Sequence, residues 1–379
     1  MIVSLFIFVN SRMRFLFRLG RSYIYYLKSK NLTEESTNQL AVTYIVEPRQ
    51  WSIYWDGKQT ADVINKSIGT KFISISENVF GLDSKIVHFG SQFMWQDFHK
   101  ITENKFRTVV SYFHGKPGDG KVIHDNFLAI LKYQKKIDRL IVPNSIVQNR
   151  MVSFGFNEKK MSLIPIAVDL KVFRPRTEEF KEEMRKRLGF KHNQIVIGSF
   201  QKDGIGWQDG DLPKMIKGPD IFLDVISELR KDIEVAVLLT GPSRGYVKAG
   251  LQEARIPFQH FEIQDYQSIS NYYQALDTYL VSSREEGGPK GLLESMASGI
   301  PVISTPVGMA VDLIEDMISG GLVDNFNPKI IAMKVLEVIH SQKKNNIVNS
   351  ALVRILECDT QVVANQILNE IYIPLLKSS

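Results

Sequence analysis

The chain has 379 residues, of which 44% are apolar and 23% are charged, a balance typical of a folded protein long enough to bury two cores. A single cysteine, Cys358, excludes an internal disulfide and a metal site built from cysteines, and it favours a reducing compartment. The net charge of +6 at pH 7 permits phosphorylated substrates, anionic lipid or nucleic acid and does not choose among them.

The excess positive charge is concentrated at the start of the chain. Residues 1–33 carry six Lys or Arg residues and no acid. The apolar run 1–9 is too short to span a bilayer, which takes about 20 residues. The charges also follow this run, the reverse of a secretory signal. We interpret residues 1–40 as a basic extension in which residues 13–28 predict an amphipathic helix at an anionic membrane surface. Two alternatives remain: a helix that packs within the first domain, or a sequence that is given with too early a start residue.

From residue 41 onward, strand patterns alternate with helical patterns. The first half of the chain predicts strands at residues 41–46, 71–75, 85–89, 108–113, 139–142 and 162–168. Helices are predicted at residues 58–66, 122–133 and 146–154. Such alternation indicates a parallel sheet with helices on both faces. We therefore expect residues 41–175 to form a Rossmann-like domain.

Charged, turn-rich residues at 169–194 mark a domain boundary, and a second alternation follows. It predicts strands at residues 195–200, 235–240, 258–261, 278–281 and 301–304, and helices at residues 220–229, 246–253, 268–275, 328–341 and 360–376. We expect a second Rossmann-like domain at residues 190–358 and a C-terminal helix at 359–379 that packs back toward the first domain. Ligands of such sheets bind beyond the C-terminal strand ends, so a cleft between the two domains is the expected site.

The stretch 282–299, SSREEGGPKGLLESMASG, carries the strongest chemical signal. A predicted strand leads into a glycine turn and then into a helix with proline, Pro289, at its first position. Free N–H groups and the helix dipole at such a start favour an anion. Glu286 and Glu294 bracket this site with seven residues between them. Carboxylates beside an anion site suggest a ligand with both phosphate and hydroxyl groups, as in a nucleotide sugar.

The run REEGGPKGLLESMASGIPVISTPVG at 284–308 resembles the signature of retaining glycosyltransferases of family 4, which have the GT-B fold. Looser similarity, including IPIAVDLKVFRP at 164–175, extends over most of residues 41–379. The resemblance implies two Rossmann-like doubly wound α/β domains that face a cleft, with the acceptor bound by residues 41–175 and the nucleotide-sugar donor by residues 190–358. It also implies a hexosyl-type glycosyltransferase that moves a sugar from a nucleotide-diphosphate donor to an acceptor hydroxyl, retains the anomeric configuration and needs no metal or other cofactor.

The same resemblance implies roles for the residues of this stretch. Glu286 would contact hydroxyls of the donor sugar, and Glu294 the nucleotide ribose. The chemistry agrees, because a carboxylate can accept two hydrogen bonds from a vicinal diol. Gly287 and Gly288 would let the backbone approach the diphosphate. Glu285 is the competing candidate, but seven residues separate it from Leu293 rather than from an acid.

Cations are expected on the glycine-rich loop at 201–218. The family places an Arg/Lys pair after the first strand of the nucleotide domain, and here Ser199 occupies the usual arginine position. Lys202 is the nearest cation on the loop, and Lys217 with Gly218 resembles the Lys-Gly element of the family. We predict that both lysines stabilise the leaving diphosphate; a solvated surface position is the alternative for each. The Asp-Gly-Asp triplet at 209–211 is interpreted as part of the loop and not as a metal site.

Residues of three further segments complete the predicted site. His114, in YFHGKPGDG, follows a strand of the first domain, where relatives carry a histidine that touches the donor sugar; a satisfied buried histidine is the alternative, and His88 is a weaker candidate. Ile263, in FEIQDY, is expected beside the nucleotide base, with uridine and guanosine both open. The predicted loop WSIYWDG carries three aromatic residues that either stack on an acceptor sugar or pack the loop: Trp51, Tyr54 and Trp55.

The sequence thus predicts a glycosyltransferase of cell-surface polysaccharide or lipopolysaccharide assembly, with a saccharide or lipid-linked saccharide as acceptor and no nucleic-acid partner. We expect a cytoplasmic protein, peripheral on the inner face of the plasma membrane if residues 1–30 bind anionic lipid. A GT-B sugar-nucleotide epimerase and a non-catalytic sugar-nucleotide-binding scaffold remain alternatives. A hydride-transferring Rossmann enzyme is disfavoured, because no Gly-x-Gly-x-x-Gly follows residues 41–46.

Overall fold

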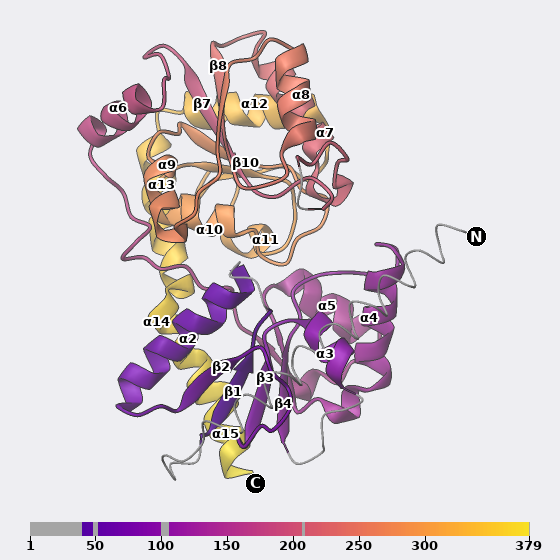
Figure 1. Cartoon of the computed structure of the whole chain (residues 1–379). Helices are drawn as coiled ribbons and strands as arrows, with labels where there is room; N and C mark the ends of the chain where they lie inside the picture. Colours follow the sequence, from indigo (N-terminus) through magenta and orange to yellow (C-terminus); the bar gives the residue numbers. More distant parts are fainter. Residues whose placement is uncertain (1–39, 48–51, 100–105, 207–208, 379) are drawn as a thin grey trace. The chain divides into compact units, whose positions relative to one another are not determined.

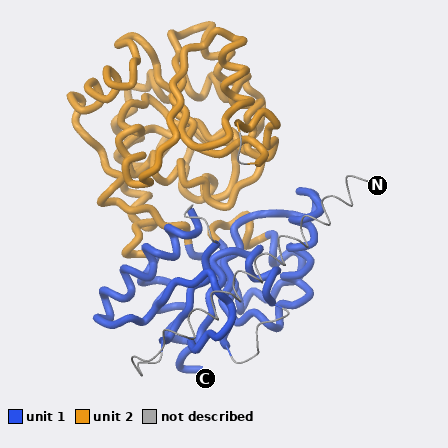
Figure 2. Tube along the Cα trace, in the orientation of Figure 1, with its two compact units in different colours: residues 1–142, 150–164, 363–379 blue, residues 143–149, 165–362 orange. Residues whose placement is uncertain are grey.

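The computed structural model describes residues 40–47, 52–99, 106–206 and 209–378 (Figure 1). The basic extension with its predicted amphipathic helix lies outside the described residues, and so does Trp51. The chain divides into unit 1, which comprises residues 1–142, 150–164 and 363–379, and unit 2, which comprises residues 143–149 and 165–362 (Figure 2). No helix in the described part of the chain is long and apolar enough to cross a membrane.

Unit 1 contains a six-stranded parallel sheet in the order β2-β1-β3-β4-β5-β6 (Figure 1). Its strands are β1 (Val42–Ile45), β2 (Ile73–Ser76), β3 (Ile86–Phe89), β4 (Arg107–Ser111), β5 (Arg139–Val142) and β6 (Met161–Leu163). Every residue of the adjacent strands β1 and β3 is buried, as expected for central strands covered on both faces. The helices that accompany the sheet are α2 (Ser52–Ile68), α3 (Gln92–Phe98), α4 (Lys121–Lys132) and α5 (Ser145–Ser153).

The C-terminal tail runs as α14 (Thr360–Gln366), a π-helical turn at Ile367–Tyr372 and α15 (Ile373–Lys377), and its residues from 363 onward belong to unit 1. Two contacts attach it there. The Tyr372 hydroxyl lies 2.6 Å from Nδ1 of His88 in β3, and the Arg107 guanidinium of β4 donates to the carbonyl of Ser378 at 2.7 Å. The tail is therefore bonded to the central strands of unit 1.

The prediction of a loop at residues 51–57 is wrong, because α2 begins at Ser52. Tyr54 and Trp55 are helical, with their rings in edge contact at 5.6 Å. Gly57, within this helix, is required by packing: a Cβ there would lie 2.6 Å from the ring of Tyr44 in β1. A close approach of helix to strand, and not a turn, selects glycine at this position.

Unit 2 contains a second six-stranded parallel sheet, in the order β12-β11-β10-β7-β8-β9 (Figure 1). Its strands are β7 (Ile195–Phe200), β8 (Val235–Thr240), β9 (Phe258–Phe261), β10 (Thr278–Val281), β11 (Val302–Ser304) and β12 (Gly321–Leu322). Its helices are α6 (Glu178–Arg187), α7 (Pro219–Leu229), α8 (Gly245–Glu253), α9 (Ile269–Tyr273), α10 (Lys290–Ala297), α11 (Ala310–Leu313), α12 (Pro328–Ile339) and α13 (Lys344–Arg354).

Alternating side chains of β7 and β8 build two separate cores in unit 2. Val196 and Leu238 join one cluster, which includes residues of α10, and Ile197 and Val237 join the other, which includes residues of α7 and α12. Successive side chains of a strand point to opposite faces, so both faces of this sheet are covered by helices. The prediction of two doubly wound parallel α/β domains is confirmed.

Some predicted boundaries differ from the structure. The strand predicted at 162–168 ends at Leu163, because Pro165 has no N–H to continue the ladder. The next residues instead contact unit 2: Ile166 donates its N–H to the Met309 sulfur at 3.4 Å, and Val168 donates to the Cys358 carbonyl at 2.8 Å. The predicted first domain extended to residue 175, whereas residues 165–175 belong to unit 2.

His88 lies in a buried polar cluster of unit 1. Its Nδ1 hydrogen-bonds the Tyr372 hydroxyl, and its Nε2 hydrogen-bonds the Ser111 hydroxyl at 2.9 Å. Burial lowers the pKa of His88 to about 3. The ring is thus a satisfied, neutral core histidine, which corrects the interpretation of His88 as a weaker candidate for a sugar contact.

We predict that His88 makes unit 1 sensitive to acid. The pKa of a histidine is near 6.5 in the unfolded chain, so between pH 6.5 and about 3 the unfolded state binds the extra proton. Stability should therefore fall by about 1.4 kcal/mol per pH unit through this window. Hydrogen exchange of the β3 amides between pH 6.5 and pH 4 measures it, with His88→Gln removing the dependence and the exposed-site control His192→Gln leaving it unchanged. A stability difference between wild type and His88→Gln that stays constant with pH would contradict the prediction.

Candidate functional site

The loop at 201–218 and the stretch at 282–299 meet in unit 2 at a contact that requires glycine. The Ser282 hydroxyl donates to the Gly218 carbonyl at 2.9 Å, and the N–H of Arg284 donates to the Ile216 carbonyl at 2.8 Å. Gly218 has a φ of 62°, and a Cβ there would lie 1.9 Å from the Ser282 carbonyl oxygen. Only glycine tolerates both this left-handed backbone and this approach. The end of β10 is therefore held directly against the start of α7.

This contact brings Lys217 to Glu286. The Lys217 ammonium donates to both carboxylate oxygens, at 2.6 and 2.7 Å, and the Ser283 hydroxyl donates to one of them at 2.8 Å. The side chain of Glu286 is 8% exposed and that of Lys217 is 22% exposed. An oriented carboxylate of this kind can still accept hydrogen bonds from ligand hydroxyls, while the ammonium supplies positive charge beside it.

Two more lysines share this region, Lys202 and Lys214. The positive charges of Lys217 and Lys202 act on the ammonium of Lys214, and so does the negative charge of Glu286. Sequence reasoning selected Lys202 and Lys217 but missed Lys214. The signal that could have found it is its place in the same glycine-rich loop, PKMIKG, three residues before Lys217.

Glu294 lies in α10 and is buried, and two tyrosine hydroxyls donate to its carboxylate. Tyr266 hydrogen-bonds one oxygen, and Tyr273 of α9 hydrogen-bonds the other at 2.7 Å. Burial, followed by the negative charge of Glu294, raises the pKa of Tyr273 well above its usual range, so this hydroxyl stays a donor. Each carboxylate oxygen has a further lone pair that could accept from a ligand. Sequence reasoning missed both tyrosines.

The glycine turn before α10 is packed from behind. A Cβ at Gly288 would lie 2.7 Å from both the Ile166 side chain and the Met309 sulfur, so packing alone already requires glycine there. The Asn144 side chain donates to the Gly287 carbonyl. Neither Gly287 nor Gly288 donates its own N–H to another described residue. Pro289 is the N-cap of α10 and not its first helical residue, which corrects the predicted helix start.

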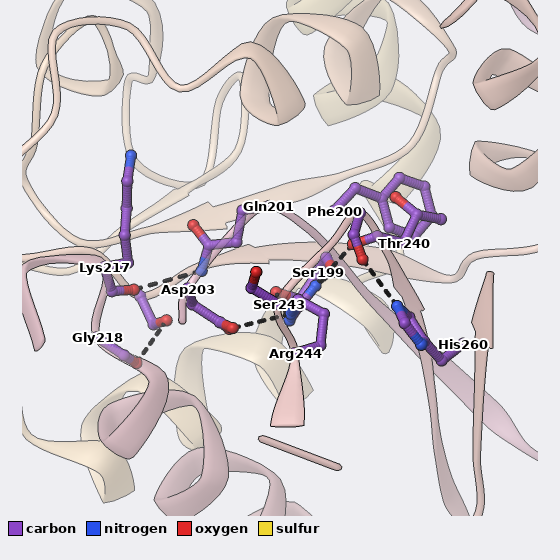
Figure 3. A network of polar contacts seen from close by, with 12 residues as sticks. Ser199, Phe200, Gln201, Asp203, Lys217, Gly218, Thr240, Ser243, Arg244 and His260 are labelled. Carbon is purple, nitrogen blue, oxygen red and sulfur yellow. Dashed lines mark hydrogen bonds and ion pairs between the residues drawn. The ribbon is translucent and has the colours of Figure 1, made fainter. Parts of the chain in front are cut away.

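A buried arginine fixes the loop that carries the lysines (Figure 3). The guanidinium of Arg244, which follows β8, donates to the Ser199 carbonyl at 2.6 Å, to the Thr240 carbonyl at 2.9 Å and to the Asp203 carboxylate at 3.0 Å. It also donates to the Ser199 hydroxyl at 3.1 Å. Burial raises the pKa of Asp203, and the charge of Arg244 opposes this shift. The position where the resemblance expects an arginine, Ser199, is thus bonded to an arginine from the next strand, which links the ends of β7 and β8.

The remaining predicted residues lie elsewhere. Ile263 follows β9 by two residues and is half-buried. His114 lies in unit 1, three residues beyond β4, where its carbonyl accepts from the Gln92 side chain at 2.7 Å. Tyr54 and Trp55 also lie in unit 1, in the first turns of α2. Within the described residues, the structure brings together the predicted residues Lys202, Lys217, Gly218, Glu286, Gly287 and Gly288 of unit 2. No group of three or more His, Cys, Asp or Glu residues that could hold a metal occurs in the described part of the chain.

We predict that truncation of Arg244 destabilises unit 2 strongly. Both side chains of the Arg244–Asp203 pair are at most 1% exposed, so Arg244→Met leaves a buried, unpaired carboxylate. The expected loss is about 3–5 kcal/mol, measured by equilibrium urea unfolding. The matched control is Arg354→Met, which removes one partner of an exposed ion pair with Glu315 and should cost less than about 1 kcal/mol. Equal effects of the two substitutions would contradict the assigned role of Arg244.

Comparison with known sequences finds a family model that matches within unit 2. Residues 180–351 match the family model of glycosyl transferases group 1. An uncharacterized glycosyltransferase of Methanocaldococcus jannaschii, MJ1178, is 29% identical over 34% of this chain and 36% of its own length. The lipopolysaccharide core biosynthesis mannosyltransferase LpsB of Rhizobium meliloti is 31% identical over 39% of this chain and 41% of its own. The chain thus spans less than half the length of these two curated relatives.

Comparison with solved structures covers nearly the whole chain. A crystal structure of Anabaena Alr3699/HepE in complex with UDP and glucose has a TM-score of 0.71 and 15% identity, and covers 90% of this chain and 100% of that chain. A glycosyltransferase from Rickettsia africae has a TM-score of 0.68 and 18% identity over the same shares. These likenesses show that the fold is that of GT-B glycosyltransferase structures.

Proposed function

We propose that this GT-B chain is a retaining glycosyltransferase that moves a sugar from a nucleotide-diphosphate donor to an acceptor hydroxyl. The observation that carries the proposal is the Lys217–Glu286 pair, which joins a cation suited to a phosphate with a carboxylate suited to sugar hydroxyls. Both residues lie within the segment that matches group 1 glycosyl transferases.

The proposed mechanism assigns charge stabilisation to unit 2. The bond between the anomeric carbon and the diphosphate oxygen breaks, and its electron pair leaves with the diphosphate. The oxygen of the acceptor hydroxyl forms the new bond to the anomeric carbon, and its proton passes to the departing diphosphate. The ammonium of Lys217, the ammonium of Lys202 and the N–H groups of Gly287 and Gly288 stabilise the charge that develops there. Preorganised donors of this kind are often the largest single contribution to catalysis. The sugar is oriented by Glu286, with His114 as the proposed contact from unit 1.

The donor is proposed to be a nucleotide sugar, with Glu294 at the ribose and Ile263 beside the base. Crystal structures of Anabaena Alr3699/HepE contain UDP, UDP with glucose, or UDP-glucose, which supports this ligand class. We propose transfer without a metal or other cofactor.

The acceptor proposal rests on the relatives. LpsB is described as a lipopolysaccharide core biosynthesis mannosyltransferase, and this supports hexosyl transfer to a saccharide or lipid-linked saccharide in cell-surface polysaccharide assembly. Tyr54 and Trp55 are the proposed acceptor contacts. A cytoplasmic location, with attachment to an anionic membrane through residues 1–30, completes the proposal.

We expect UDP or GDP to raise the melting temperature of the full chain, since a ligand that binds only the folded state stabilises it.

Glu286→Ala and Lys217→Ala should each lower the transfer rate by roughly 10²–10³, because each removes a contact to the reacting sugar or diphosphate. Product analysis separates transfer from epimerisation of the nucleotide sugar. The control Lys329→Ala, an exposed lysine of unit 2, should transfer at the wild-type rate. Transfer that survives in the Glu286→Ala/Lys217→Ala double variant would refute the assignment.

We also expect Glu294 to distinguish ribose from deoxyribose. A charge-assisted hydrogen bond to a ribose hydroxyl is worth about 1.5–3 kcal/mol, or roughly 10–100-fold in Kd. Wild type should therefore bind the ribonucleoside diphosphate more tightly than its 2′-deoxy or 3′-deoxy analogue. Glu294→Gln should reduce that preference, whereas the control Glu337→Gln should keep it. Calorimetric titration measures these affinities, and an unchanged preference in Glu294→Gln would place Glu294 outside the ribose site.

A further inference from the structure

We propose that Lys214 is a third cationic ligand of the donor diphosphate and supplies the charge that the serine at position 199 cannot. The inference rests on the proposed function, because it concerns the same donor. Three observations carry it: the fold of the loop at 201–218, the lack of a partner for the Lys214 side chain, and the charge balance around it.

The loop doubles back on itself and thereby brings Lys214 beside Lys202. Gly204 and Pro213 form an antiparallel bridge, and the N–H of Ile205 donates to the Leu212 carbonyl at 2.8 Å. The N–H of Lys214 then donates to the carbonyl of Asp203, the residue after Lys202, at 2.6 Å. The backbone of Lys214 is therefore fixed next to the segment that follows β7.

The same backbone turns directly into the Lys217 site. The Lys214 carbonyl accepts from the N–H of Lys217 at 2.8 Å, at the start of a short 3₁₀ turn that ends at Gly218. A buried ion pair supports this arrangement. The Arg244 guanidinium donates to the Asp203 carboxylate (Figure 3). The backbone carbonyl of the same Asp203 accepts the N–H of Lys214. Lys202, Lys214 and Lys217 thus belong to one braced loop and not to independent surface positions.

The charges around Lys214 are unbalanced. Burial and the positive charges of Lys217 and Lys202 lower the pKa of Lys214, and Glu286 is the carboxylate that acts against this shift. The ammonium groups of Lys202, Lys214 and Lys217 thus outnumber the one carboxylate that acts on Lys214. The carboxylate is already paired with Lys217. Within the part of the chain that the structure describes, the side chain of Lys214 forms no hydrogen bond or ion pair.

A diphosphate diester fits this imbalance. It carries two negative charges on adjacent phosphoryl groups, so it relieves the repulsion among the ammonium groups. Lysine is a common phosphate ligand, and charge-assisted hydrogen bonds to phosphate are among the stronger ones in proteins. Arg244 cannot bind the diphosphate, because its guanidinium is buried and hydrogen-bonded to Ser199, Thr240 and Asp203. Lys214 is therefore the cation that replaces the missing arginine.

The test compares phosphate-dependent with phosphate-independent binding in the full chain. Wild type, Lys214→Ala and Lys214→Arg are titrated calorimetrically with UDP, GDP, uridine and guanosine at two salt concentrations. We expect Lys214→Ala to raise the Kd of the bound nucleoside diphosphate about tenfold, with a weaker salt dependence. Affinity for the corresponding nucleoside should not change, and Lys214→Arg should stay within about threefold of wild type. The control Lys329→Ala should match wild type throughout.

The outcomes separate this inference from the proposed function. A wild-type chain that binds neither UDP nor GDP refutes the proposed function and this inference with it. Tight binding by wild type, together with an unchanged Kd and an unchanged salt dependence in Lys214→Ala, overturns the inference alone. An equal loss of nucleoside and nucleoside-diphosphate affinity also overturns it, because that result assigns Lys214 a structural role in place of a phosphate contact.

Discussion

The ion pair between Lys217 and Glu286 is the interaction on which the proposed site depends. It joins the loop after β7 to the turn after β10, two segments that are distant in sequence and adjacent at the C-terminal edge of one sheet. The pair places an ammonium group suited to a phosphate in direct hydrogen-bond contact with a carboxylate suited to sugar hydroxyls. A ligand that engages both must therefore carry a phosphoryl group and a hydroxyl group close together, as the donor of a glycosyl transfer does.

A second, deeper layer keeps this pair in place. Arg244 and Asp203 are fully buried, and their contacts tie the ends of β7 and β8 to the loop that carries the lysines. A buried ion pair is an uncertain source of net stability, but its directional bonds specify one arrangement of the chain. The side chains of Lys217 and Glu286 keep 22% and 8% of their surface exposed, whereas those of Arg244 and Asp203, which support the loop, are sealed from solvent. Rigid support of this kind is what preorganised charge stabilisation requires.

Much of the fold, but only part of the site, could be predicted from the sequence. Parallel α/β architecture followed from the alternation of strand and helix patterns. Glu286 and Glu294 followed from their spacing around a glycine turn, and Lys217 from its resemblance to the Lys-Gly element of the family. Arg244 and Lys214 could not be found in this way, because their positions depend on tertiary hydrogen bonds to β7 and to Asp203. The helical start of α2 could not be predicted for the same reason. Gly57 is required by its tertiary contact with the ring of Tyr44, and its neighbours in sequence do not indicate this contact.

The contact between Gly218 and Ser282 has a consequence for attempts to exchange donor specificity between related chains. Because the α-carbon of one segment touches the carbonyl of the other, neither backbone can shift without the other. A graft of the lysine-bearing loop alone would meet a foreign partner at this point of contact. An exchange of donor specificity would therefore have to transfer the loop at 201–218, the stretch at 282–299 and the buried Arg244 together.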